Sequence, residues 1–81
     1  MKLVDTVEMM NSEDFKERFK AEYHQLRLRI DGLSKMLEKY KDGTLPFTPK
    51  CSYDLLNGQL KAMVLYRTYL EERAMIEEIQ L

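Results

Sequence analysis

The sequence predicts an all-α protein, a long antiparallel helical hairpin with a short N-terminal arm that forms oligomers. Of 81 residues, 33% are charged and 44% hydrophobic, with three glycines and two prolines, a composition typical of helices with narrow apolar seams. Apolar residues recur at steps of three and four over two long segments, and both prolines lie between these segments. We therefore expect an arm at residues 1–10 and a hairpin domain at residues 11–81.

The arm reads "MKLVDTVEMM" and is too short and mixed to predict a helix, so we treat it as optional to the fold. The first long helix is expected at about residues 12–41. Asn11 or Ser12 would cap it, followed by acidic residues that favour the positive end of the helix dipole. Gly43 would end it in a left-handed conformation. Its heptad seam consists of Phe19, Tyr23, Leu26, Ile30, Leu33, Leu37 and Tyr40.

A connector at residues 42–51 contains Pro46 and Pro49, which favour extended or turn geometry in the residues before them. The second long helix is expected at about residues 52–80. Ser52 is the preferred N-cap, and Asn57 is the alternative for a later start.

The second helix shows two apolar stripes, whereas packing on one partner helix needs only one. The first stripe consists of Leu56, Leu60, Met63, Leu70 and Ala74, with Arg67 in the same seam. The second stripe lies about 100° round the helix and consists of Leu55, Ala62, Leu65, Tyr69, Ile76 and Ile79. Either the N-terminal arm or a second subunit must cover the second stripe, and this surplus predicts a homo-oligomer.

The sequence contains no phosphate-binding glycine loop, dinucleotide-binding fingerprint or metalloprotease motif. A single histidine, His24, and a single cysteine, Cys51, do not make a metal site or a catalytic pair within one chain. We therefore expect a protein that is not an enzyme and has no cofactor. The lone cysteine agrees with a reducing cytoplasm, and no membrane-spanning run occurs.

The net charge of −1 argues against a partner with many phosphates, such as duplex DNA, and leaves room for a small anion held by a few cations. Tyrosines and arginines at helical spacing can stack a base and hold a phosphate. In the alternative interpretation, tyrosines edge the seam while arginines snorkel across it. Arg67 is the exception, because a charge in the seam needs a ligand or a partner such as Glu22 or Tyr23.

Three segments carry a family resemblance: "EDFKERFKAEYHQLRLRIDGLSKML", "LPFTPKC" and "QLKAMVLYRTYLEERAMIE". They resemble short phage and prophage proteins named after a crAss-like phage reading frame, over roughly residues 10–79. The shared pattern is E-Y-x-x-L in the first helix and L-x-A-M-x-x-Y-x-x-x-L-x-x-R-A in the second. Its positions here are Glu22, Tyr23, Leu26, Leu60, Ala62, Met63, Tyr66, Leu70, Arg73 and Ala74.

In size and hairpin design this family is similar to phage anti-defence sponges, the anti-CBASS cyclic-nucleotide binder and the Thoeris inhibitor. That resemblance implies a phage protein in the host bacterial cytoplasm that sequesters a cyclic oligonucleotide or another nucleotide signal between subunits. The ligand-binding residues we expect are Tyr23, Arg27, Tyr66 and Arg67, with tyrosines stacking bases and arginines pairing with phosphates. The alternatives are a module that binds a host protein through the second stripe, and a protein associated with DNA or RNA.

Overall fold

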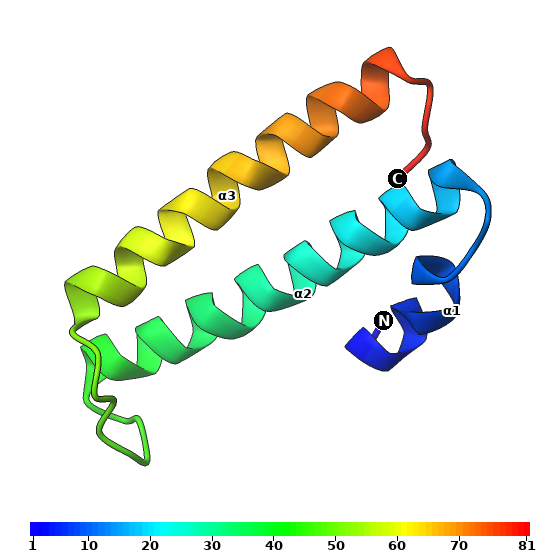
Figure 1. Ribbon diagram of the computed structural model, residues 1–81. Helices are drawn as coiled ribbons and strands as arrows, with labels where there is room; N and C mark the ends of the chain where they lie inside the picture. The colour runs from blue at the N-terminus through cyan, green and yellow to red at the C-terminus, as the bar shows by residue number, and fades with distance from the viewer.

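The protein is all-helical, as the sequence predicts, and its computed structural model describes residues 1–81. A 3-10 turn, η1 (Leu3–Thr6), and a short helix, α1 (Val7–Met10), form the arm. Two long helices follow, α2 (Phe15–Asp42) and α3 (Tyr53–Ile76), and there is no strand. The molecule is elongated, with extents of 43 × 24 × 16 Å, and α2 and α3 lie side by side along most of its length (Figure 1).

The expected cap of the first long helix at Asn11 or Ser12 is wrong. Asn11 instead ends α1, because its N–H bonds back to carbonyls of that helix. Asp14 is the N-cap of α2, and its carboxylate accepts a hydrogen bond of 2.9 Å from the Lys16 N–H. Ser12 Oγ supports this turn by accepting from the Asp14 N–H at 3.1 Å. The other end is confirmed, since Gly43 adopts a left-handed φ of 74°.

The Ser52 cap of α3 is confirmed, because its hydroxyl oxygen accepts a hydrogen bond of 3.1 Å from the Leu55 N–H. The helix ends at Ile76, earlier than the expected residue 80. Glu78 takes a left-handed φ of 56°, and the Ile79 N–H then bonds to the Ala74 carbonyl at 2.8 Å. This reversal buries Ile79 in the core, so its placement on the second stripe was wrong.

The core lies between the N-terminal half of α2 and the C-terminal half of α3. Its buried members are Phe19, Tyr23, Leu26, Ile30, Leu70, Ala74 and Ile79, with Leu60, Met63 and Val64 packed partly against them. At the other end of the helix pair, the Tyr40 and Tyr53 rings meet edge to face at 5.7 Å. Only 10 of 81 residues are buried, so each core contact accounts for a large share of the stability.

The N-terminal arm packs on α2 and makes no contact with α3 (Figure 1). Thr6 is fully buried there; its hydroxyl donates to the Leu3 carbonyl at 2.7 Å and accepts from Gln25 Nε2 at 2.9 Å. The arm therefore leaves the second stripe of α3 uncovered, which excludes one of its two expected covers. None of the helices is both long enough and apolar enough to cross a lipid bilayer.

Candidate functional site

Tyr23 links the two long helices at the centre of the candidate site. Its side chain is 6% exposed, and its hydroxyl donates a hydrogen bond of 2.7 Å to Glu71 Oε2 on α3. The Arg27 guanidinium lies 5.9 Å from the centroid of the Tyr23 ring, and the His24 ring meets that ring edge-on at 5.8 Å. Burial, and then the bond to Glu71, raise the pKa of Tyr23. Tyr23 is thus a fixed part of the helix contact, and its ring is not an open platform for a base.

Arg27 and Arg67 both lie close enough to Tyr23 for their positive charges to lower its pKa, against the larger effect of burial. Arg27 is exposed on α2, and Arg67 is half-buried on α3. The only ion pair in the chain joins Arg73 to Glu77 at 3.5 Å, so neither Arg27 nor Arg67 is paired with a carboxylate. Two arginines from different helices are therefore free to meet an anion.

Arg67 makes no hydrogen bond or ion pair with Glu22 or Tyr23, the partners considered from the sequence. The Tyr23 hydroxyl donates to Glu71 instead. No buried side-chain nitrogen in the chain lacks a partner, so the Arg67 guanidinium reaches solvent at the edge of the helix contact. Snorkelling of this kind keeps the stem in the seam and leaves the charge accessible.

Tyr66 lies apart from the other three expected ligand-binding residues. It is 44% exposed and makes no hydrogen bond or ring contact with Tyr23, Arg27 or Arg67. Adjacent helical residues point about 100° apart, so Arg67 faces α2 while Tyr66 lies toward the outer side of α3. The structure therefore brings together Tyr23, Arg27 and Arg67, and excludes Tyr66 from that cluster within one chain.

A cavity of about 240 Å³ lies beside Arg27, between the arm and α2, and is lined by Met1, His24, Arg27, Leu28 and Asp31. Burial, and then the positive charges of Arg27, Lys20 and the chain's N-terminus, lower the pKa of His24. The sequence analysis assigned no role to His24 and missed this cavity. The spacing of His24, Arg27 and Asp31 puts them on one helix face, but nothing in the pattern showed that the arm closes over it.

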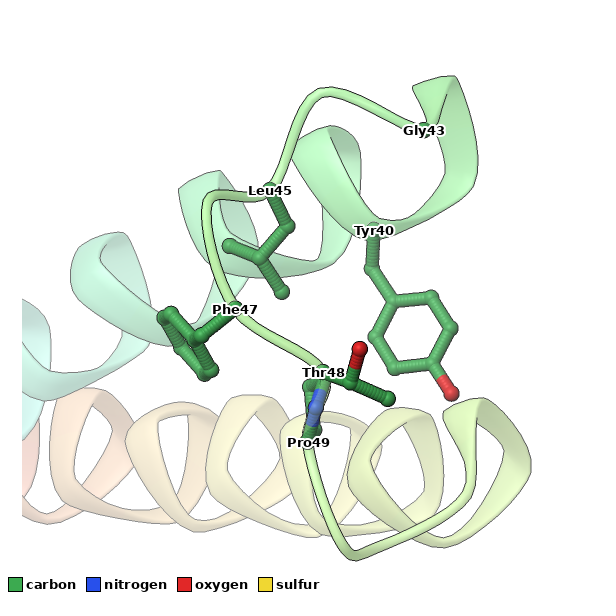
Figure 2. Close-up of a pocket in the computed structure, with 6 residues that line it drawn as sticks. All are labelled: Tyr40, Gly43, Leu45, Phe47, Thr48 and Pro49. Atoms are coloured by element: carbon green, nitrogen blue, oxygen red, sulfur yellow. The ribbon is translucent and has the colours of Figure 1, made fainter.

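A second cavity, of about 160 Å³, lies in the connector at the far end of the helix pair. Figure 2 shows its lining, in which Leu45 and Phe47 of the connector lie near Tyr40 at the end of α2. Thr48 and Pro49 complete it on the side of α3. The lining contains no charged residue, so this cavity lacks the cations that an anion would need.

The fold and the site describe a small helical binding protein whose free cations lie along a two-helix seam. The comparisons agree with that class: a family model, Sequestin, matches residues 13–76, and the chain belongs to the Sequestin family. No curated protein and no solved structure matches the chain. The family name indicates sequestration, and hence the binding of some partner. The matched range includes Tyr23, Arg27, Tyr66 and Arg67 and excludes the arm, whereas the resemblance to phage proteins stays a prediction.

Proposed function

We propose that this chain is a phage-derived, non-enzymatic anti-defence protein that binds and sequesters a small nucleotide immune signal. In this proposal antiparallel hairpins associate into a homo-oligomer, and the signal lies at or near the contacts between subunits. The observation that supports it most is the pair of arginines, Arg27 and Arg67, which flank Tyr23 from two helices without a carboxylate partner.

Arginine suits this role because its planar guanidinium donates two parallel hydrogen bonds to one phosphate. The surroundings add further positive charge, since Lys20 and the N-terminus lie near His24 beside Arg27. Two arginines, and not a basic surface, match a ligand with one to three phosphates, in keeping with the net charge of −1. Sequestration needs tight binding and no bond cleavage, so the proposal assigns no catalytic residue.

The site geometry changes the roles that we expect for Tyr23 and Tyr66, both of which the sequence analysis assigned to base stacking. Tyr23 is buried and bonded to Glu71, so its part is to hold Arg27 by the ring contact and not to stack a base. Tyr66 is exposed and is the better stacking platform, but it lies outside the arginine cluster of its own chain. Base stacking on Tyr66 would therefore use the surface where subunits meet.

The test is thermal unfolding in the presence of cyclic dinucleotides, cyclic trinucleotides and ADP-ribose-type compounds, with unphosphorylated nucleosides as the negative panel. A ligand at about 100 times its dissociation constant stabilises the folded state by about 2.7 kcal/mol. The ligand released by denaturation should be chemically intact by mass spectrometry. No shift with any phosphorylated compound, or a cleaved ligand, would refute the proposal.

Two variants localise the binding. Arg27→Gln and Arg67→Gln should each weaken a ligand that stabilises the parent, because each removes a charged hydrogen-bond donor. Arg29→Gln is the matched control: Arg29 is exposed on the same helix, and two residues of helix rotate it about 200° from Arg27. Equal losses in all three variants would point to general charge attraction and not to a site.

A second candidate function, the binding of a host protein, is favoured by the exposed apolar stripe of α3. The exposed stripe of α3, which includes Leu55, Leu65 and Tyr69, could recruit a host protein. This reading requires that the chain be a monomer on its own, with the stripe open. The oligomeric state therefore separates the two functions.

A further inference from the structure

The outer stripe of α3, defined as Leu55, Ala62, Leu65, Tyr69 and Ile76, is an exposed surface that no other element of the chain covers. Its large members are well exposed, with values of 63% for Leu55, 57% for Leu65, 59% for Tyr69 and 82% for Ile76. These residues repeat at helical spacing, so they form one continuous face. The arm packs on α2 and does not reach this face.

The solvent-accessible surface area indicates how much of the chain a partner would have to bury. The accessible surface is 6157 Å², whereas a compact monomer of 9.7 kDa exposes about 5,100 Å². The excess of about 1,000 Å² is close to the roughly 800 Å² that each partner contributes to a standard protein interface. Burying the outer stripe against an identical copy would remove part of this surplus.

Charges along the stripe indicate which way two copies would pair. Lys61 and Glu72 lie on the same edge of the stripe, both are exposed, and neither has an ion-pair partner within the chain. They are eleven residues apart, or about 17 Å along the helix. When two helices pair antiparallel about a two-fold axis, equivalent edges face each other, so Lys61 of each copy meets Glu72 of the other.

A parallel pair lacks this match. The edge with Lys61 and Glu72 would then face the opposite edge of the partner helix, where the charged residues are Arg73 and Glu77. Arg73 is already engaged within its own chain: its guanidinium lies 5.0 Å from the centroid of the Phe19 ring and pairs with Glu77. Lys61 would have no acidic neighbour, so the parallel arrangement leaves more charge uncompensated.

We propose that two copies of this chain pair antiparallel through the outer stripe of α3, with the two-fold axis level with Tyr66. The position of the axis follows from the match, because it lies midway between Lys61 and Glu72. Tyr66 of both copies then lies at the interface, where each can contribute to a site that one chain lacks. The pairing stands on the exposed surface and charges, and only the role of Tyr66 rests on the proposed function.

The native chain carries its own orientation probe, because Cys51 is the single cysteine and is exposed next to the start of α3. A nitroxide on Cys51, measured by double electron–electron resonance, should give a distance of about 45 Å between copies in the antiparallel pair. A parallel pair would place the two labels within about 20 Å. Sedimentation velocity over a range of concentrations should show a dimer. A monomer at every concentration, or the short distance, overturns the proposal.

Substitutions test the face itself. Leu65→Glu should abolish the dimer, while Phe47→Glu should leave it intact, since Phe47 is also an exposed apolar side chain at 56% but lies in the connector. Circular dichroism must show unchanged helix content in both. Lys61→Glu and Glu72→Lys should each weaken association about fivefold, and the double exchange should restore it. Dimerisation of Leu65→Glu, or no recovery in the double exchange, contradicts the assigned face or orientation.

Nucleotide titrations on the same samples separate this inference from the proposed function. A dimer with the long label distance that binds no nucleotide supports the pairing and refutes the sequestering role. An oligomer that binds a nucleotide and that Leu65→Glu leaves intact supports the sequestering role and refutes pairing through the outer stripe.

Discussion

Arg67→Met should stabilise the hairpin while it weakens ligand binding. Arg67 occupies a seam position of α3, is half-buried, and has no carboxylate partner. Methionine keeps an unbranched stem at the seam and adds apolar surface where Arg67 holds its solvated guanidinium at the edge of the helix contact. A half-buried methionine contributes about 1 kcal/mol of transfer free energy, so we expect the free energy of unfolding to rise by about 1 kcal/mol. For a chain of this size, that gain raises Tm by about 4–8 °C.

The assay is urea unfolding followed by circular dichroism at 222 nm, at one fixed protein concentration because association would shift the midpoint. Arg29→Met is the matched control and should change the free energy of unfolding by less than about 0.5 kcal/mol, since Arg29 is exposed. The pKa of Tyr23 should rise in Arg67→Met, because the positive charge of Arg67 lowers it. A loss of more than about 1 kcal/mol would show that the charge holds the fold together, which refutes the reasoning.

Three further changes test the core, a helix end and the arm-side cavity. Leu70→Ala should cost about 2–3 kcal/mol in urea unfolding, because Leu70 is 1% exposed but its two-helix core can partly collapse. Gly43→Ala should cost about 1 kcal/mol in the same assay, since φ is 74° at Gly43. The folded state lowers the pKa of His24, so the unfolded chain takes up the proton first as pH falls below 6.5. Urea midpoints at pH 7.5 and 5.5 should therefore fall less for His24→Gln than for the parent, and an equal fall would contradict the burial of His24.

Much of the helix pairing could be predicted from the sequence because it depends on periodicity alone. Residues at steps of three and four share a face, and burying that face selects one side of each helix. The seam of α2 is confirmed at Phe19, Tyr23, Leu26, Ile30 and Leu37, while Leu33 and Tyr40 are half-buried. The seam of α3 is confirmed at Leu70 and Ala74. Gly43 and Ser52 were found for the same kind of reason, since each satisfies helix-end groups with chemistry local to its own turn.

The features that were missed depend on contacts between distant segments or on competition between neighbours. Asn11, Ser12 and Asp14 are all residue types that favour the N-cap position. Asn11 is the C-cap of α1, and Asp14 is the N-cap of α2. The burial of Thr6 against Gln25 links residues nineteen positions apart, which no local pattern reports. Ile79 followed the helical period of the outer stripe, but a left-handed Glu78 turned it into the core.

At the candidate site, Glu71 is used in a hydrogen bond between the two helices, whereas Arg27 and Arg67 have no carboxylate partner. This arrangement is consistent with the proposed role of the two arginines in binding an anion. Arg67 and Glu71 are four residues apart on α3, a spacing at which opposite charges can pair on a helix surface. Glu71 instead accepts the Tyr23 hydroxyl at 2.7 Å, so the carboxylate nearest in sequence is used for the contact between helices. Arg27 and Arg67 are thereby left with their charges beside a neutral tyrosine. Under the proposed function, an anion from outside the chain would be the partner of these two arginines.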